Sequence, residues 1–365
     1  MVSFKLSEDQ QALVDILRRY AEKDMRPQAH EADEAEQPNA DIIKAGWGFG
    51  LVPTALPEEL GGIGDMSAIT GALAMEELAY GDLSSALHLL TPALFAYPVT
   101  LYGTAEQRET FLPLFLEEDF APATSALIEP GILFDPFDLK TTASAQDGKI
   151  IINGVKGYVP LADEASHILV YARNSESGAT EAYIVPRDAD GVSIDFREKL
   201  MGIRALPTYR VKFENVAVDA DAKLGGAVGI DFQNIITRQN IALSAAAVGV
   251  ARASFEYARD YAKEREQFGR PIAQNQSIAF MLAEMAIEID ATRLMVWECA
   301  WKVDQAQDAS RDAYLTRQYA NNMVLTVTDG GVQTLGGYGF IREYPAERWL
   351  RNGRGFTTFD GLAIV

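Results

Sequence analysis

Apolar positions recur every three or four residues over the first third of the chain and again over the last third. From Ser7 to about Glu118 this spacing predicts a helical region of five or six elements, and Ser7 with Gln10 forms a capping box at its start. The helices expected later in this region cover residues 70–80, 84–102 and 105–118.

The pattern changes near Phe120, where short β-branched and apolar runs replace the helical spacing. Over residues 208–218 the apolar positions Tyr209, Val211 and Phe213 alternate, as in a half-buried strand. Further strands are expected at residues 150–152 (leading into a turn at 153–154), 167–172, 181–185 and 191–195. Short strands with turns between them predict a compact antiparallel domain.

From about Ile230 the helical spacing returns. Long helices are expected over 240–265, 273–307 and 312–335, and the first is rich in alanine, as close helix packing requires. The predicted fold class is therefore α+β: an N-terminal helical domain (1–120), a middle β-barrel or sandwich (121–225) and a four-helix-bundle-like domain (226–365) that is short at its C-terminus.

Composition narrows the classes of partner. The net charge of -20 argues against nucleic acid or an anionic membrane surface, because both favour a basic face. The single cysteine, Cys299, excludes an internal disulfide, and the three histidines lack metal-ligand spacing, so no metal site is expected. The N-terminus has no signal-peptide pattern and no run of ~20 apolar residues occurs, so a cytoplasmic location is expected.

The stretch from Gln333 to Val365 combines a glycine cluster with a lone acid. Gly336 and Gly337 allow tight turns and close backbone approach, and Asp360 stands in otherwise uncharged surroundings. The residues alone leave two interpretations open: a glycine-rich turn followed by a solvated acid, or a site that contacts another molecule.

A resemblance to a known family favours the second interpretation. The segment YAKEREQFGRPIAQNQSIAFMLAEMA, from Tyr261, closely resembles the stretch by which the acyl-CoA dehydrogenase family is recognised. Six further motifs follow the family order, so that the resemblance covers essentially the whole chain. They are PEELGGIG at 57–64, MEELAYGD at 75–82, YGTAEQRETFLPLF at 102–115, IEP at 128–130, LMGIRALPTYRVKFENVAV at 200–218 and QTLGGYGFIREYPAERWLRNGR at 333–354. The family shares the predicted α–β–α order.

The resemblance implies FAD-dependent α,β-dehydrogenation of an acyl-CoA or related acyl thioester. Asp360 stands at the position of the carboxylate base that takes the α-proton, while the β-hydrogen leaves as hydride to N5 of FAD. It also implies a role in lipid metabolism, an electron-transferring flavoprotein as acceptor, and a dimer or homotetramer with FAD between subunits.

The resemblance also assigns cofactor contacts. Arg265 is expected to pair with the FAD pyrophosphate of the neighbouring subunit, and Phe268 to pack on the cofactor. The other expected cofactor contacts are Gln267, Asn275, Gln276, Gln333, Leu335, Gly336, Gly337, Ile128, Tyr158 and Leu362. The residues expected at the substrate are Phe134, Arg238, Asn240, Phe359 and Gly361.

The flavin and substrate side departs from the family pattern. Ile128 stands where the family has a threonine that bonds the flavin, and Phe134 stands where it has a serine. Pro160 replaces a hydroxyl residue and has no backbone N–H to donate. Leu362 removes another hydroxyl, and Asp360 is one methylene shorter than the usual glutamate.

Two accounts of these departures stay open. In the first, the chain is a working flavoenzyme with Asp360 as base, remodelled for an unusual acyl group or for a thioester carried by something other than free CoA. In the second, it is a non-catalytic subunit of a hetero-oligomer with an active paralogue and still supplies half of that partner's FAD site. A flavin-free binding protein on the same scaffold is a third possibility. The retained carboxylate favours the enzyme.

Overall fold

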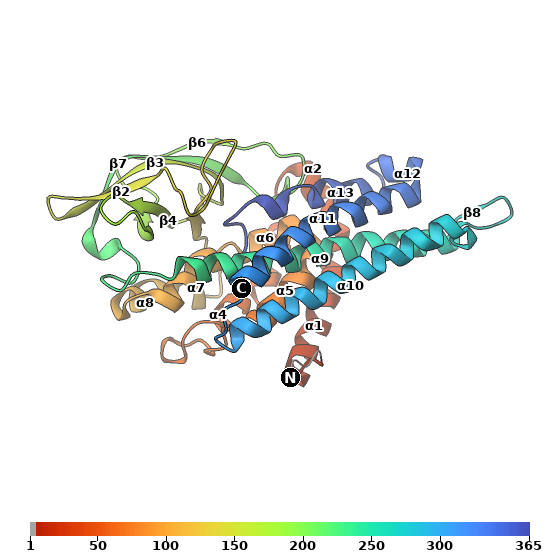
Figure 1. Ribbon diagram of the computed structural model, residues 1–365, viewed down its shortest axis with the longest axis horizontal. Coiled ribbons are helices and arrows are strands. Elements are labelled where there is room, and N and C mark those ends of the chain that lie inside the picture. Colours follow the sequence, from red (N-terminus) through yellow and green to blue (C-terminus); the bar gives the residue numbers. More distant parts are fainter. Residues whose placement is uncertain (1–4) are drawn as a thin grey trace.

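The computed structural model describes residues 5–365 and divides into three parts in chain order (Figure 1). A group of N-terminal helices is followed by a twisted sheet, and three long helices then run side by side along the molecule. The sheet lies at one end of the long axis, and the short β8–β9 hairpin (Glu266–Gln267 and Arg270–Pro271) extends at the other end.

The first helix begins as its sequence predicts. The Ser7 hydroxyl accepts from the backbone N–H of Gln10, and the Gln10 side chain accepts from the backbone of Ser7, so the predicted capping box is confirmed. The elements of the N-terminal part are α1 (Glu8–Tyr20), the π-helical turn η1 (Ala21–Met25), α2 (Arg26–Ala35), α3 (Ala40–Trp47), α4 (Leu51–Thr54), η2 (Glu58–Leu60), α5 (Ala68–Gly81), α6 (Leu83–Leu90), α7 (Ala93–Tyr102), α8 (Ala105–Phe111) and η3 (Leu112–Leu116).

Two predicted helices of this part are wrong in extent. The single helix expected over 84–102 is two helices, α6 and α7, because Pro92 lacks the N–H that would continue the first one. The helix expected over 105–118 ends at Phe111 and continues as a 3₁₀ turn that contains Pro113. Both errors come from proline inside a strongly apolar run.

The sheet follows the order β1-β4-β2-β3-β7-β6, and β5 pairs with β4. Most pairs are antiparallel, as expected, and two parallel pairs, β1 with β4 and β2 with β4, add to them. The strands are β1 (Thr124–Ala126), β2 (Thr142–Gln146), β3 (Lys149–Pro160), β4 (His167–Asn174), β5 (Thr180–Pro186), β6 (Val192–Arg197) and β7 (Thr208–Asp219), and the 3₁₀ turn η4 (Ala220–Ala222) follows them.

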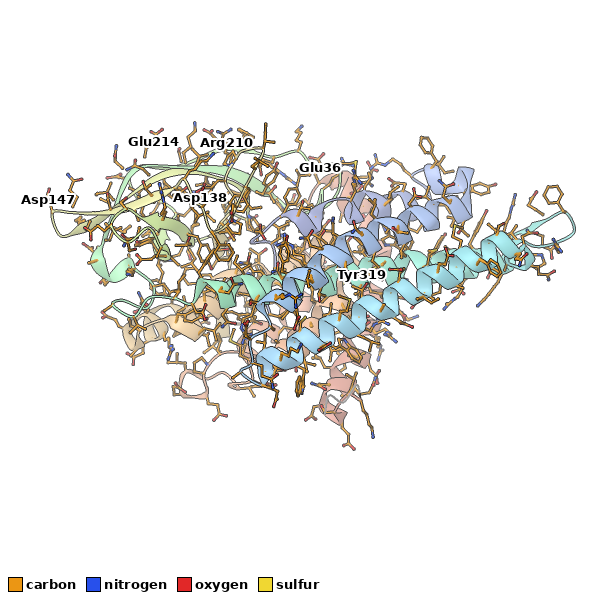
Figure 2. The ribbon with its side chains drawn as sticks, in the orientation of Figure 1. Glu36, Asp138, Asp147, Arg210, Glu214 and Tyr319 are labelled. Atoms are coloured by element: carbon orange, nitrogen blue, oxygen red, sulfur yellow. The ribbon has the colours of Figure 1, made fainter. Side chains whose placement is uncertain are left out.

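Strand β3 runs straight through the turn predicted at residues 153–154. Its pairing with β7 shifts register between Ile152 and Gly154, so the glycine marks a bulge instead of a chain reversal. A Cβ at Gly154 would lie 2.3 Å from the Thr141 hydroxyl, and glycine therefore suits this close approach. The reversal comes earlier, at the β2–β3 hairpin, whose tip carries Asp147 (Figure 2).

The C-terminal helices confirm the predicted periodicity. They are α9 (Phe232–Glu264), α10 (Gln276–Asp304) and α11 (Ser310–Leu335), joined by η5 (Ile272–Gln274) and followed by α12 (Gly337–Phe340), α13 (Ala346–Gly353) and η6 (Phe356–Thr358). Helix α9 starts eight residues before the predicted 240, where the Asp231 side chain caps it. A Cβ at Gly249 would lie 2.3 Å from the Glu76 carbonyl oxygen, so glycine allows α9 to approach α5 closely.

One buried carboxylate joins the three parts. Asp33 on α2 is 3% exposed and accepts from Arg351 of α13 at 2.8 Å and from Arg342 at 3.1 Å. Arg204, in the loop before β7, lies 3.5 Å from the same carboxylate and 2.9 Å from Glu36, which Figure 2 places between the sheet and the helices. This Asp33 cluster fixes the sheet against both helical parts.

Candidate active site

An open cleft of about 670 Å³ lies where the sheet meets the segment after α13. Its walls come from the loop after β1, from β3 and from β6–β7, and residues 358–360 close one side. Five residues predicted for the site line this central cleft: Ile128, Phe134, Tyr158, Phe359 and Asp360. The structure thus brings the predicted base and the predicted flavin-side residues together.

Two glycines shape the loop that carries Asp360. Gly355 has φ 90° and Gly361 has φ 80°, a backbone conformation that favours glycine. A Cβ at Gly361 would also lie 3.2 Å from the Leu127 Cβ, so the loop passes close to the end of β1. The backbone N–H of Gly361 donates to the Gln239 side chain at 3.2 Å, which anchors the loop on α9.

Asp360 forms an ion pair that the sequence did not predict. Arg317 of α11 donates from Nη1 to Oδ1 of Asp360, and the two side chains are only 11% and 10% exposed. The same guanidinium donates to the Asn240 side chain at 2.9 Å and to the Thr357 carbonyl oxygen at 2.6 Å. Over the described residues, the second carboxylate oxygen of Asp360, Oδ2, has no hydrogen-bond partner and is not fully buried.

Two other carboxylates of the cleft have structural partners. Glu129 accepts from the buried Lys156 at 3.0 Å and from the backbone N–H groups of Lys140 and Thr141, both at 2.7 Å. Burial lowers the pKa of Lys156 to about 8, although the Glu129 charge opposes this. Glu198 accepts from the Tyr158 backbone N–H at 2.8 Å, and its pKa is raised by burial.

The inner wall of the cleft is apolar and aromatic. The rings of Tyr158 and Phe359 stack with centroids 4.6 Å apart. Ile128 and Phe134 add apolar surface, and Pro160 is buried at the end of β3. A flat apolar ring suits this wall, but Ile128, Phe134 and Pro160 offer no side-chain donor to the polar edge of such a ring.

A second pocket, of about 380 Å³, lies at the far end of α11. Its lining includes the predicted cofactor contacts Arg265, Gln267, Gln333, Leu335, Gly336 and Gly337. A Cβ at Gly336 or Gly337 would meet no other atom within 4 Å, so the backbone here borders open space. The exposed guanidinium of Arg265 lies 5.7 Å from the Tyr338 ring centroid. An exposed cation beside bare backbone fits a phosphate-bearing ligand.

Three further predicted cofactor contacts come shortly after Arg265 and Gln267 of this α11-end pocket in the sequence. Phe268, at the tip of the β8–β9 hairpin, is 99% exposed and adopts φ 55°. Asn275 precedes α10 and accepts from Arg270 at 2.8 Å, and Gln276 is the first residue of that helix. The Phe268 ring therefore makes no packing contact of its own within the described chain that would bury it.

Four predicted residues have packing partners in place of an open site. Arg238 is 7% exposed and donates to the Val365 carbonyl oxygen at 2.8 Å, while Asn240 is 2% exposed and holds Arg317. Leu362 is 1% exposed in the helical core, and Gly361 is buried. None of the four lines the central cleft or the α11-end pocket.

Sequence reasoning missed Arg317, Gln239 and Glu198. Arg317 had a signal: it falls on the buried stripe of α11 formed by Ala313, Ala320 and Val324, where an arginine needs a partner. Gln239 and Glu198 lie in ordinary helical and strand-edge patterns, and only the fold brings them to the loop and the cleft.

Among the described helices, none has the length and apolar character needed to cross a bilayer.

Comparison with known proteins agrees with this geometry. Three family models match in chain order: the N-terminal domain of acyl-CoA dehydrogenase over residues 7–119, the middle domain over 124–216 and the C-terminal domain over 232–363. The chain therefore belongs to the acyl-CoA dehydrogenase family. Proteins of this family are flavin oxidoreductases that act on CH–CH bonds with FAD as cofactor.

Individual relatives align over nearly the whole chain. The human mitochondrial short-chain specific acyl-CoA dehydrogenase is 31% identical over 371 residues, which cover 100% of this chain and 89% of that protein. The caffeyl-CoA reductase-Etf complex subunit CarC of Acetobacterium woodii is 31% identical over 98% of this chain and 96% of its own. The butyryl-CoA dehydrogenase structure from Megasphaera elsdenii superposes with a TM-score of 0.87 at 30% identity, covering 96% of this chain and 94% of that one.

Proposed function

We propose that the chain catalyses FAD-dependent α,β-dehydrogenation of an acyl thioester, with Asp360 as the base that takes the α-proton. The observation that carries this proposal is the free Oδ2 atom of Asp360 in the central cleft. Glu129 and Glu198, the other two carboxylates named in the cleft, accept backbone or lysine hydrogen bonds. Glu129 is bonded through both oxygens and Glu198 through Oε2, whereas Asp360 combines a free Oδ2 with the position of the family's base.

The chain also offers a donor for the thioester carbonyl. Among the described residues the backbone N–H of Asp360 makes no hydrogen bond, whereas the neighbouring N–H of Gly361 donates to Gln239. A carbonyl oxygen that accepts from the Asp360 N–H would have its α-carbon beside the same residue's carboxylate. Such a donor stabilises the negative charge that develops as the α-proton leaves.

Arg317 holds the base in place. Its guanidinium fixes Oδ1 through a charge-assisted hydrogen bond and leaves Oδ2 to react. It also joins Asp360 to Asn240 on α9 and to the Thr357 carbonyl, so the loop and two helices share one network. A base fixed in this way needs little reorganisation to reach the α-carbon.

The two pockets suit the two ends of FAD. Bound FAD supplies the acceptor for the β-hydrogen. Ile128 and Tyr158 would flank the ring in the central cleft, and the α11-end pocket, with Arg265 and Gly336, would hold the nucleotide end. None of the described residues lines both pockets, and Arg317, bonded to Asp360 of the cleft, is 16 residues from Gln333 at the α11-end pocket, roughly 24 Å along the helix. We therefore propose that the nucleotide end is held by a neighbouring subunit, with Phe268, Asn275 and Gln276 beside it. A dimer or tetramer follows.

We extend the proposal to the electron acceptor. The relative CarC is named as a subunit of a complex with Etf, and a structure titled for the electron-transferring flavoprotein of Acidaminococcus fermentans matches with a TM-score of 0.88 at 32% identity. An electron-transferring flavoprotein is therefore the acceptor to test first.

A second candidate function has observations of its own. Arg317 pairs with one oxygen of Asp360, and Tyr158 stacks directly on Phe359. The hydroxyl residues that the family has on the flavin side are replaced here by Ile128, Phe134 and Pro160. These features favour a non-catalytic subunit that pairs with an active paralogue and contributes the α11-end pocket to it.

The two candidate functions predict different flavin contents of the purified protein and different behaviour of one variant. The enzyme should purify with bound flavin, and an acyl-CoA substrate should bleach the visible flavin band. Asp360→Asn should abolish that bleaching and keep the flavin, because it removes the base and keeps the side chain's size. Asp290→Asn is a matched control, since this carboxylate is 72% exposed on α10. Protein that binds FAD only when co-expressed with a paralogue would favour the second candidate.

A further inference from the structure

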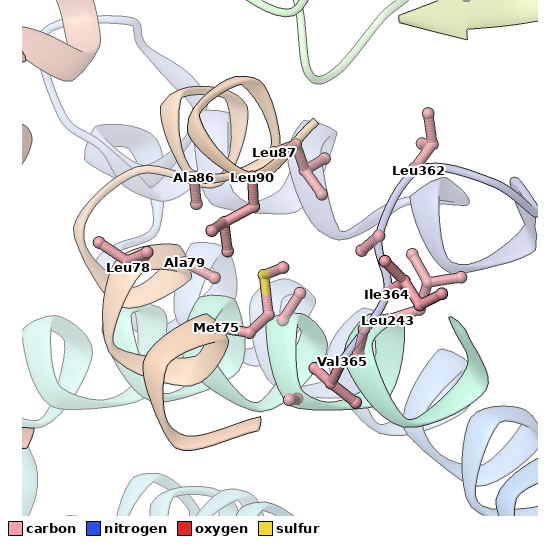
Figure 3. Close-up of a cluster of buried hydrophobic side chains, with 14 of the residues drawn as sticks. Met75, Leu78, Ala79, Ala86, Leu87, Leu90, Leu243, Leu362, Ile364 and Val365 are labelled. Atoms are coloured by element: carbon pink, nitrogen blue, oxygen red, sulfur yellow. The ribbon is translucent and has the colours of Figure 1, made fainter. Parts of the chain in front are cut away.

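The segment from Leu362 to Val365 leaves the central cleft directly after Asp360 and enters the helical core. Its four residues are between 0% and 3% exposed. Figure 3 shows Leu362, Ile364 and Val365 among Leu87, Leu90 and Leu243, side chains of α6 and α9. The chain itself thus fills the interior immediately behind the proposed base.

Specific contacts hold this segment in place. Arg238, 7% exposed, donates from Nη1 to the Val365 carbonyl oxygen at 2.8 Å, and its Nε has no partner among the described residues. On the opposite side, a Cβ at Gly71 of α5 would lie 2.9 Å from the Val365 Cβ. Glycine at 71 therefore makes room for Val365, and a buried guanidinium is used to fix the backbone beside it.

The segment leads from one space toward another. At one end is the central cleft, which Asp360 lines. At the other is an apolar cavity of about 120 Å³ with Ile364 and Val365 in one wall and Gly71, Ala74 and Tyr97 among the rest. The Leu362–Val365 segment runs from behind Asp360 to the wall of this cavity, and we call it the partition.

We propose that this partition limits the length of the acyl group, so that the substrate carries a short or compact acyl chain. The inference rests on the proposed role of Asp360. The α-carbon must reach Asp360, and carbons beyond it either stay in the open cleft, whose apolar wall the flavin ring would cover, or enter the core. Ile364 and Val365 occupy the path from Asp360 into the helical core. A long acyl chain therefore gains no burial along this path.

The test is binding of S-butyl-CoA, S-hexyl-CoA and S-octyl-CoA to the FAD-loaded protein by calorimetry. These thioethers have no thioester-activated α-proton, so no turnover interferes. Each CH₂ that becomes buried is worth about fourfold in affinity. We expect the wild-type dissociation constants to agree within about threefold. Ile364→Ala combined with Val365→Ala should bind S-octyl-CoA at least about tenfold more tightly than wild type, with S-butyl-CoA unchanged.

Ile289→Ala is the matched control, because Ile289 is 3% exposed on α10 and lies outside both the cleft and the second cavity. It should leave the length dependence flat. If the double variant does not fold, Val365→Ala alone gives the same direction on a smaller scale. Wild-type affinity that climbs tenfold or more from butyl to octyl would overturn the proposal, as would variants with wild-type length dependence. Failure of all three thioethers to bind would instead overturn the proposed function and this inference with it.

Discussion

The Asp33 cluster makes a quantitative prediction about how the three parts of the chain are held together. Asp33→Asn keeps the shape of the side chain and removes the charge that three arginines share. Removing one partner of a buried ion pair costs about 3–5 kcal/mol. Arg342 is 48% exposed and the other two are 21% and 18% exposed, so water partly rehydrates them. We therefore expect a loss of about 3 kcal/mol in unfolding free energy.

The pH dependence has a definite sign. Burial alone would raise the pKa of Asp33, but the hydrogen bond and charge of Arg351 and the charge of Arg204 lower it below the ordinary 3.8. A carboxylate with a lowered pKa stabilises the fold fully above its unfolded pKa, and the contribution is lost as the pH falls through the folded pKa. The difference between wild type and Asp33→Asn should be equal at pH 7 and pH 5 and should shrink only below about pH 4.

Urea unfolding at these pH values measures the difference. Glu34→Gln is the control, because Glu34 also pairs with Arg342 but is 43% exposed, and a surface pair contributes at most about 1 kcal/mol. A loss below 1 kcal/mol for Asp33→Asn at pH 7, or a difference that already shrinks between pH 7 and pH 5, would show that Asp33 does not hold the three parts together through its charge.

Two further predictions concern cofactor retention and the loop that carries the base. Arg265→Ala should weaken FAD retention by roughly 10- to 150-fold, the equivalent of a charge-assisted contact of about 1.5–3 kcal/mol. The control Arg259→Ala removes only a surface pair with Asp260 and should leave retention unchanged. Equilibrium dialysis of FAD measures both variants, and equal retention would exclude Arg265 from the site. Gly361→Ala should destabilise the fold by more than Gly355→Ala does. Both variants force alanine to a positive φ, at a cost of about 1–2 kcal/mol, but only at Gly361 would the new Cβ also lie 3.2 Å from Leu127. Equal shifts in melting temperature would contradict this prediction.

Much of the fold follows from local pattern, and the exceptions have physical causes. The long helices α9, α10 and α11 were predictable because a 3.6-residue stripe persists over several turns. The break at Pro92 was missed because apolar residues continue on both sides of it, so the hydrophobic pattern does not mark the end of α6. Strands β1 and β2 were missed because they are short and rich in Ser, Thr and Ala, and their partners lie far along the chain.

The candidate site likewise has residues that local motifs predict and residues that only the packing of distant segments brings together. Asp360, Tyr158 and the glycines at 336–337 were predictable because a motif surrounds each. The Arg317–Asp360 pair was not, since it joins residues 43 positions apart through the packing of α11 on the loop. The burial of Arg238 and Leu362 was likewise invisible, because it depends on where the Leu362–Val365 segment goes after the cleft.

The position of the α11-end pocket, remote from the cleft on the same chain, has a consequence for how the protein responds to dilution. In the proposed arrangement FAD spans two subunits and binds only the assembled form, so it would stabilise assembly by mass action, and assembly would in turn retain it. Each protomer would then lose its redox competence at low protein concentration, before any of its own helices or strands unfold. Abundance in the cell would act as a control on this flavoprotein, with Arg265 and Phe268 at the contact through which it works.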